Sequence, residues 1–323
     1  MLDSILGSLR VVALATKTDF RSITSREVAL FEGPVGWGEF SPFLEYSYSQ
    51  SVPWLTSAIE AAFVPAPPAL RSDIAVNATL PALDNPSEIE ALLETYPGCS
   101  VIKVKVGNDP DKDRERLQII RELRPDAKIR IDVNGLWNVD QAASFLNSVG
   151  DIEYAEQPCA TVEELRELKK RTQVKLVGDE VIRKAKDPFA VDLSDAVDIL
   201  MLKVAPLGGI TRSLEIAQHH KLPVVVSSAL ESAVGISYGL KLASALPSLN
   251  FACGLGTGSL LAVDVDQLPI KDGMIEVTDV RPDISVLNKL AASNERLNWW
   301  KNRIRMTWSA GAESYIYERG WNV

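Results

Sequence analysis

Five charged residues recur at nearly constant spacing through the middle of this 323-residue chain. Intervals of 27, 24, 23 and 24 residues separate, in order, Lys105, Asp132, Glu156, Asp179 and Lys203. Each stands at or near the end of a short apolar run, as in KVKVG, RIDVNG, YAEQP, LVGDE and MLKVAP. Buried charges are costly unless they are paired or bound to a metal. Five such residues at equivalent positions therefore predict a functional site.

The types of these residues indicate proton transfer beside a metal ion. Asp132, Glu156 and Asp179 offer hard oxygen ligands without His or Cys, and this donor set suits Mg²⁺. Lysines flank the carboxylates. A lysine is a useful base when its pKa is lowered, and a second ammonium nearby, such as that of Lys103 beside Lys105, has this effect. Such a base can remove a proton alpha to a carboxylate while the metal stabilises the enediolate that forms.

The elements that must position these residues follow an alternating pattern from Ala75 onward. The predicted strands are residues 75–80, 101–106, 128–133, 152–157, 175–179, 198–204, 223–228 and 250–254. The predicted helices are residues 86–94, 111–123, 139–149, 162–170, 209–221 and 233–246, and the stretch after Asp179 matches a helix least well. This pattern predicts an α/β fold with a closed (β/α)8 TIM barrel. A doubly wound open sheet is the alternative, but no glycine-rich phosphate loop follows the first strand.

Strand parity places the charged residues inside this barrel, because alternate side chains of a barrel strand point inward. In VIKVKVG, the apolar Ile102 and Val104 must face the helices, so Lys103 and Lys105 point inward. By the same parity Asp132 points inward. The charged residues then lie at the carboxyl ends of the strands, where barrel enzymes carry their active sites.

The first 73 residues have a different pattern and predict a separate domain. Its predicted elements are strands at residues 11–15, 27–31 and 36–40 and a helix at residues 51–63. A proline cluster from Pro65 ends this helix, so we expect the barrel domain at residues 74–271. A further strand at residues 274–278 is expected to return to the N-terminal domain, which residues 272–323 would join. The tail from Leu287 is polar-aromatic and partly helical, and its pattern indicates no role.

Composition and charge exclude several classes of protein. The net charge of −9 repels phosphate backbones, so nucleic acid is not expected as a partner. Cys99, Cys159 and Cys253 form neither a disulfide framework nor a CxxC metal site, which indicates a reducing compartment. We find no apolar run that could span a membrane and no signal-peptide pattern. We therefore expect a cytoplasmic protein, as a monomer or homo-oligomer.

Several segments resemble the muconate-lactonizing branch of the enolase superfamily: KVKVG, DVNG, AEQP, GDE, LK and SSALES, in this order and spacing. More narrowly, GWGEFSPFLEY at residues 36–46 and VNATLPA at residues 76–82 resemble the o-succinylbenzoate synthases of actinobacteria, enzymes of menaquinone biosynthesis. The resemblance implies a modified barrel under an N-terminal α+β capping domain. Loops near residues 17–24 and 41–50 would close over the ligand. The residues expected over the barrel mouth are Phe20, Arg21, Phe43, Leu44 and Tyr46.

The resemblance also implies a role for each charged residue. Asp132, Glu156 and Asp179 would hold Mg²⁺, and Lys203 would face Lys105 across a small carboxylate substrate. The implied reaction is the syn dehydration of 2-succinyl-6-hydroxy-2,4-cyclohexadiene-1-carboxylate to o-succinylbenzoate. Lys105 would remove the alpha proton and then return a proton to the departing hydroxyl. Lys203, as a cation over the ring, would stabilise the enediolate.

Each candidate substrate-binding residue also has a structural interpretation. Arg21 could pair with the succinyl carboxylate or be a surface arginine. Asn134 could orient a metal ligand or form an Asn-Gly turn. Ser228 and Leu230 could bind a substrate carboxylate through backbone N–H groups or belong to a plain loop. Gly254 completes the set. It opens GLGTGS, which follows the last strand and lacks the lysine of a phosphate loop, so nucleotide binding is not expected.

Other activities fit parts of the pattern. Racemases of N-acylamino acids are the main alternative, as a separate or accompanying activity, because they share two opposed lysines. Dipeptide epimerases would carry an acidic pair after the eighth strand, which GLGTGS lacks. A mandelate-racemase-like enzyme would carry a histidine where Ser227 and Ser228 stand, whereas His219 and His220 belong to a helix end. A barrel that binds a ligand without catalysis is a third class, and the intact set of charged residues argues against it.

Overall fold

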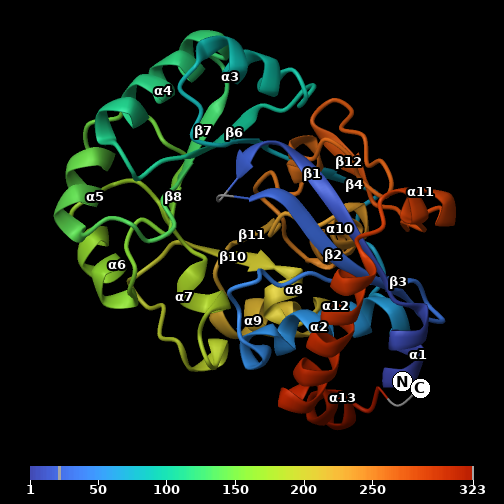
Figure 1. The fold of residues 1–323 in the computed structure, drawn as a ribbon. Coiled ribbons are helices and arrows are strands. Elements are labelled where there is room, and N and C mark those ends of the chain that lie inside the picture. Colours follow the sequence, from blue (N-terminus) through green and yellow to red (C-terminus); the bar gives the residue numbers. More distant parts are fainter. Residues whose placement is uncertain (21–22, 322–323) are drawn as a thin grey trace.

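A parallel seven-stranded sheet forms the centre of the molecule in the computed structural model, which describes residues 1–20 and 23–321 apart from the side chains of residues 18–20 and 23. Its strands, neighbours in chain order, are β5 (Ala78–Leu80), β6 (Val101–Lys105), β7 (Lys128–Asp132), β8 (Tyr154–Glu156), β9 (Leu176–Gly178), β10 (Ile199–Lys203) and β11 (Val224–Ser227). The helical segments that connect and follow them are α3 (Pro86–Leu93), α4 (Pro110–Leu123), α5 (Val139–Leu146), α6 (Val162–Lys169), α7 (Glu180–Arg183), η1 (Pro188–Ala190), α8 (Val204–Leu207), α9 (Ile210–His220), α10 (Ala233–Ala245) and η2 (Gly256–Leu260). The sheet curls, with α3 to α6 on its outside (Figure 1).

The sheet closes into a barrel without a regular eighth strand in the described chain. Two isolated parallel bridges, Val76 to Cys253 and Ser227 to Gly254, join its two edges. The predicted strand at residues 250–254 is therefore wrong as a regular strand, although the segment takes the eighth position. The predicted fold class, a modified TIM barrel, is confirmed.

The N-terminal region packs a small sheet against one long helix. Its elements are α1 (Leu2–Ser8), β1 (Arg10–Phe20), β2 (Ile23–Glu32), β3 (Trp37–Phe40) and α2 (Tyr48–Phe63), and the sheet is antiparallel in the order β1-β2-β3. Helix α2 begins before the predicted residue 51 because Ser47 and Gln50 form a capping box. At the expected domain boundary, β4 (Asp73–Ala75) pairs antiparallel with β12 (Met274–Glu276). The predicted strand near residue 274 thus exists, and its partner is β4 rather than the three-stranded sheet.

The C-terminal segment is helical and returns to the N-terminal region. Its elements are α11 (Ile284–Lys289), α12 (Asn294–Thr307), a π-helical turn η3 (Trp308–Ala312) and α13 (Glu313–Glu318). Figure 1 shows α12 beside α2, and the two helices are in contact. Trp300 is fully buried, edge-on to Phe40 at 5.8 Å between ring centroids. It therefore packs in the core, as aromatic side chains of this size commonly do.

Two glutamates of the N-terminal region bind the starts of two barrel helices. Glu39 on β3 accepts hydrogen bonds from the N–H groups of Ser232 and Gly235, at 3.1 and 3.0 Å, at the start of α10. Glu60 on α2 accepts one from the N–H of Thr211, at 3.0 Å, at the start of α9. Burial raises the pKa of both carboxyl groups, and hydrogen bonds oppose that shift. Because unpaired N–H groups at a helix start favour an acceptor, these contacts dock the N-terminal region on the barrel.

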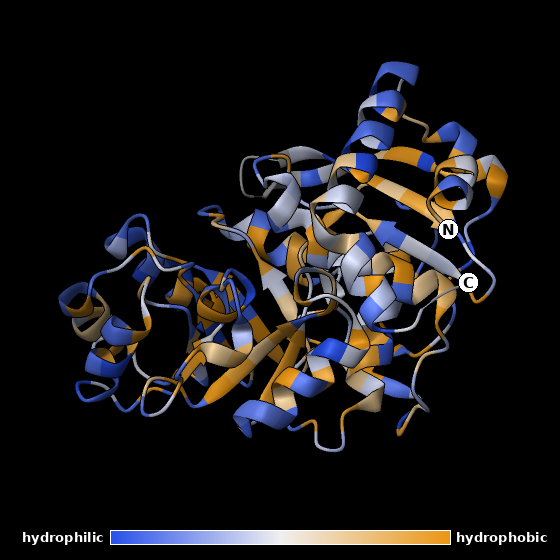
Figure 2. Ribbon diagram, turned by 90° about the horizontal axis from the view of Figure 1, so that it is seen from below, coloured by the Kyte–Doolittle hydropathy of each residue, from blue (hydrophilic) through white to orange (hydrophobic). Residues whose placement is uncertain are grey.

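Apolar residues gather on the barrel strands and on the helix faces turned toward them, while hydrophilic residues lie outside (Figure 2). Val104, Ile131, Ala155 and Leu200 on four of the strands are fully buried. This burial is the main favourable term in folding. In the parts of the chain that the structure describes, no helix is both long and apolar enough to cross a bilayer.

Candidate active site

The carboxyl ends of consecutive strands bring the five charged residues together. In the parallel register, Lys105 at the end of β6 pairs with Asp132 at the end of β7, and Asp132 pairs with Glu156 at the end of β8. Asp179 follows β9 directly, and Lys203 ends β10. Residues at one level of adjacent strands lie side by side. The charged side chains therefore form one arc at the barrel mouth, and we call it the charged arc, with Lys103 included.

Cations and carboxylates alternate along the charged arc. The contacts are Lys105 Nζ to Asp132 Oδ2 (2.7 Å), Lys103 Nζ to Asp132 Oδ2 (3.6 Å) and to Glu156 Oε2 (2.8 Å), and Lys203 Nζ to Glu156 Oε1 (3.6 Å) and to Asp179 Oδ2 (2.6 Å). The most exposed of these side chains is that of Lys105, at 16%. Three lysines thus balance three carboxylates, as buried charges require.

The neighbouring charges keep the acidic groups ionised. Burial would raise the pKa of Asp132, but the lysines around it hold that pKa well below its usual range. Burial acts in the same direction on Asp179, where Arg183 and Lys203 hold the pKa low. Burial would lower the pKa of Lys103, and the carboxylates beside it raise that pKa instead. At neutral pH these two carboxylates therefore stay charged, and Lys103 stays a cation.

The acidic residues of the arc have the chemistry of a hard-cation site. Asp132, Glu156 and Asp179 present only carboxylate oxygens, which suit Mg²⁺. Glu156 Oε1 is buried and accepts no hydrogen bond, so it fits an additional cation. Across the described residues, however, no three acidic, His or Cys side chains are clustered tightly enough to hold a metal, and lysine ammonium groups contact the carboxylates instead. The assignment of these three residues as ligands stays a prediction.

Asn134 lies in a turn beside Asp132, and its N–H donates to Asp132 Oδ1 at 3.2 Å. Its side-chain oxygen accepts a hydrogen bond from Lys105 Nζ, and its Nδ2 donates to Glu180 Oε1 at 3.1 Å. Its φ is 53° and Gly135 follows at φ 74°, as in an Asn-Gly turn. The turn therefore presents the amide oxygen of Asn134 to Lys105 Nζ.

The loop after β11 reaches the same pocket. Ser228 and Leu230 line it with Thr257, and the hydroxyl oxygens of Ser228 and Thr257 are 2.6 Å apart. Ser228 donates its backbone N–H to the carbonyl oxygen of Gly254 at 3.1 Å. This N–H is therefore not free to bind a substrate carboxylate, contrary to the prediction. Leu230 has a left-handed φ of 62°, and its carbonyl accepts from Arg26 Nε at 3.2 Å. Gly254 does not line this pocket, and a Cβ at its position would clash with Ser227 Oγ, which does.

Arg183 is a site residue that the sequence pattern did not reveal. Its Nε donates to Asp179 Oδ1 and Oδ2 at 3.0 and 3.1 Å, and its Nη1 donates to Tyr46 Oη at 2.8 Å. Its side chain is 5% exposed and lines the pocket. The available signal was its position four residues after Asp179, one turn along a helix. That helix, α7, falls in the stretch with the weakest helical pattern.

The residues expected over the barrel mouth have different positions. Phe43 lines the pocket and Tyr46 contacts Arg183. Leu44 is 58% exposed. Arg21 and the side chain of Phe20 lie outside the described residues, so their expected roles are not addressed by the structure.

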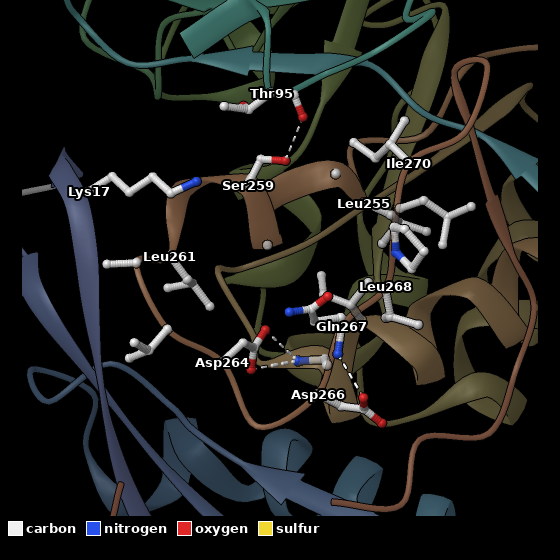
Figure 3. Close-up of a pocket in the computed structure, with 18 of the residues that line it drawn as sticks. Lys17, Thr95, Leu255, Ser259, Leu261, Asp264, Asp266, Gln267, Leu268 and Ile270 are labelled. Carbon is white, nitrogen blue, oxygen red and sulfur yellow. Dashed lines mark hydrogen bonds between the residues drawn. The ribbon is translucent and has the colours of Figure 1, made fainter. Parts of the chain in front are cut away.

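The pocket beside the charged arc is small, about 30 Å³, but Lys105 also lines a neighbouring cavity of about 570 Å³ with Asn134. Another cavity, of about 450 Å³, shares the wall formed by η2 (Figure 3). Lys17 and Asp264 face this cavity, and Asp264 accepts from the N–H of Ala233 at 3.0 Å, at the start of α10. Residues of the charged arc do not line it. Chemistry rather than size therefore identifies the candidate active site.

Two sequence-family profiles match the chain. The family described as Enolase N-terminal domain-like matches residues 11–62. The family described as Enolase C-terminal domain-like matches residues 88–286. Together they cover the small sheet with its helix and nearly the whole barrel.

Similar proteins from mycobacteria share one name. The o-succinylbenzoate synthase of Mycobacterium ulcerans is 49% identical over 312 residues, which cover 94% of each chain. That of Mycobacterium tuberculosis is 48% identical over 322 residues, covering 97% of this chain and 98% of its own.

Solved structures share the fold at lower sequence identity. The muconate lactonizing enzyme of Pseudomonas putida has a TM-score of 0.72 at 20% identity, covering 88% of this chain and 98% of its own. The N-succinyl Arg/Lys racemase of Bacillus cereus has a TM-score of 0.72 at 18% identity, covering 88% and 97%. At these identities the likeness shows the fold alone.

Proposed function

We propose that this chain, which belongs to the enolase superfamily and, within it, to the o-succinylbenzoate synthases, dehydrates 2-succinyl-6-hydroxy-2,4-cyclohexadiene-1-carboxylate to o-succinylbenzoate. The enzyme is then a carbon–oxygen lyase of menaquinone biosynthesis that acts on a small carboxylate. The observation that carries the proposal is the charged arc, in which lysines flank buried carboxylates at consecutive strand ends. Mg²⁺ dependence is general in the superfamily.

Lys105 is the acid/base in this proposal. Its Nζ is held by Asp132 and Asn134, and its side chain borders the larger cavity. As a neutral amine it takes the proton alpha to the substrate carboxylate, and the C–H electron pair moves toward that carboxylate. The resulting ammonium then returns a proton to the ring hydroxyl on the same face. The C–O bond breaks, water leaves and the ring becomes aromatic.

Lys203 and Lys103 contribute positive charge. Lys203 lies at the other end of the arc, 2.6 Å from Asp179 Oδ2, and as a cation it stabilises negative charge on the substrate. The raised pKa of Lys103, caused by Glu156 and Asp132 against the effect of burial, keeps this residue charged throughout. Preorganised charges in a water-poor site stabilise a transition state more strongly than they would in water.

Asp132, Glu156 and Asp179 would hold the divalent ion. Such an ion, when bound, supplies Lewis-acid stabilisation of the charge that develops on the substrate carboxylate. The buried Glu156 Oε1, which accepts no hydrogen bond, supports this assignment. Asn134 and Arg183 orient the flanking groups through their contacts with Lys105 and Asp179.

The proposal also assigns the domain boundaries of the chain. Residues 1–73 with about 272–323 would form the cap, and residues 74–271 would form the catalytic barrel. The contact between α12 and α2, and the glutamates that bind the starts of α9 and α10, support a cap of this extent. A cytoplasmic location, the absence of nucleic-acid partners and the monomer or homo-oligomer state stay predictions from composition.

Racemisation of N-succinyl amino acids is the second candidate. It is favoured by the positions of Lys105 and Lys203 at opposite ends of the arc, each on its own carboxylate. A racemase needs a base on each face of the substrate, whereas syn dehydration needs one.

One experiment tests both candidates. Purified protein is given the cyclohexadiene carboxylate or N-succinyl amino acids, with Mg²⁺ or with EDTA, and o-succinylbenzoate and inverted amino acid are quantified. The proposal expects o-succinylbenzoate with Mg²⁺ and none with EDTA. Racemisation without dehydration would favour the second candidate. Neither activity, in protein that is folded by circular dichroism, would contradict both.

A further inference from the structure

Helix α12 lies beyond residue 286, where the matched barrel family ends, and it packs against α2 and β1 (Figure 1). Glu27 on β2 fixes the helix, accepting hydrogen bonds from Arg296 Nε at 2.9 Å and from Trp300 Nε1 at 2.8 Å. Arg303 follows on the same helix. An anchored helix can hold an arginine in one direction, because its backbone does not move with the side chain.

Arg303 directs its guanidinium at the segment of residues 43–46, which we call the mouth turn. Its Nη2 donates to the carbonyls of Phe43 and Tyr46, both at 2.9 Å, and to Ser51 Oγ at 3.2 Å. The turn also has one internal bond, from the Tyr46 N–H to Phe43 O at 3.1 Å. Arg303 therefore binds both ends of the mouth turn at once.

The burial of Arg303 makes this arrangement costly. The residue is 2% exposed and Nε donates no hydrogen bond. Its donors go to carbonyls and one hydroxyl rather than to a carboxylate. Taking a guanidinium out of water without a carboxylate partner carries a large desolvation penalty. The rings of Trp299 and Trp300, whose centroids lie 5.1 and 5.5 Å from the guanidinium carbon, offset part of this penalty.

The mouth turn connects directly to the charged arc. Phe43 lines the pocket, and Tyr46 Oη accepts from Arg183 Nη1 at 2.8 Å. Arg183 in turn holds both carboxylate oxygens of Asp179, at 3.0 and 3.1 Å. Direct contacts thus run from the C-terminal helix to a predicted metal ligand. Partners that orient a ligand tune the metal site although they do not touch the metal.

We propose that Arg303 is a positioning residue for the dehydration: it fixes the mouth turn over the substrate and, through Tyr46 and Arg183, the carboxylate of Asp179. This inference rests on the proposed function and gives the C-terminal segment a part in it. Arg303 shapes the site without touching the reacting atoms. Its loss therefore alters metal affinity and substrate binding together.

The test compares Arg303→Met, Arg303→Lys and Tyr46→Phe with a control, Arg305→Met, whose arginine is exposed on the same helix. We expect Arg303→Met to lower kcat/KM by about 10- to 100-fold, mainly through a higher KM, and to weaken Mg²⁺ binding by about 10-fold in calorimetry without substrate. Arg303→Lys keeps the positive charge but lacks the planar set of guanidinium N–H donors, so it should restore only part of the lost kcat/KM and Mg²⁺ affinity. Tyr46→Phe removes only the contact with Arg183 and should weaken Mg²⁺ binding by a smaller factor.

The outcomes separate this inference from the proposed function. If wild-type protein makes no o-succinylbenzoate, the proposed function fails, and Mg²⁺ titrations of the same variants still decide whether Arg303 positions the carboxylate. If wild-type protein is active and Arg303→Met matches the control in KM, kcat and Mg²⁺ affinity, the inference is overturned. If Arg303→Met does not fold, Tyr46→Phe decides: Mg²⁺ affinity and KM equal to wild type overturn the inference, and a loss in both supports it.

Discussion

Removing one negative charge from the centre of the charged arc tests how its ion pairs are balanced. Glu156 is fully buried, and its carboxylate contacts Lys103 Nζ at 2.8 Å and Lys203 Nζ at 3.6 Å. At an effective dielectric constant of about 20, Coulomb's law gives about 6 and about 5 kcal/mol for these attractions. Desolvation offsets much of this energy, and breaking a buried pair costs about 3–5 kcal/mol.

Glu156→Gln keeps the shape of the side chain and removes its charge. We expect the free energy of unfolding to fall by about 3 kcal/mol, the lower end of that range. Lys103 retains Asp132 at 3.6 Å, and Lys203 retains Asp179 at 2.6 Å, so neither cation is left alone. Mg²⁺ affinity should fall by at least about 100-fold, because even residues that only orient ligands change it by about 10- to 100-fold.

Urea unfolding followed by circular dichroism and Mg²⁺ calorimetry measure these two effects. Glu163→Gln, an exposed change on α6, is the matched control and should alter stability by less than about 0.5 kcal/mol. If Glu156→Gln unfolds at the same urea concentration as this control, the stabilising role of the Glu156 ion pairs is refuted. An unchanged Mg²⁺ affinity would refute the role of Glu156 as a ligand.

Three further predictions concern a lysine and two buried glutamates. Lys203→Arg keeps a cation that cannot act as a base at neutral pH, so dehydration should persist while any racemisation of N-succinyl amino acids stops. Equal loss of both activities would contradict the assignment of Lys105 as the sole acid/base. Burial, followed by the charge of Glu39, raises the pKa of Glu231 from 4.5 to about 7. The folded state then holds this proton where the unfolded chain has lost it, so the free energy of unfolding should fall by roughly 2–3 kcal/mol as pH rises from about 4.5 to about 7, and then level off. Urea titrations from about pH 5 to about pH 8 should show a flatter slope for Glu231→Gln, and an unchanged slope would contradict this assignment. Glu39→Ala removes the acceptor that caps α10 and should cost about 1–2 kcal/mol, and wild-type stability would exclude that capping role.

The charged arc was predictable from the sequence because a barrel places every strand end at one level. Regular spacing then selects residues that meet in space although they are far apart in the chain. Lys105, Asp132 and Glu156 occupy paired positions of neighbouring strands for this reason. The alternating pattern likewise predicted the curled sheet and most of its helices.

Contacts between distant segments left no periodic signal. Glu39 binds the start of α10, and Arg303 binds the mouth turn, across separations that no local pattern encodes. Closure of the barrel was also unpredictable in detail, because two bridges replace the eighth strand. In the closed barrel the N–H of Ser228 donates to the carbonyl of Gly254, whereas the sequence predicted that this N–H would bind substrate.

Lys105 transfers the proton in the proposed dehydration, and the rate of o-succinylbenzoate formation by Lys105→Ala is the decisive measurement of this role. The measurement uses saturating Mg²⁺, with the fold of the variant verified by circular dichroism. We predict that wild-type protein forms the aromatic product and that Lys105→Ala is slower by at least about 10³-fold, since general acid–base catalysis contributes about 10²–10⁴-fold to each proton transfer and Lys105 serves two. A folded Lys105→Ala variant that forms product within about 10-fold of the wild-type rate would contradict the role of Lys105 as acid/base.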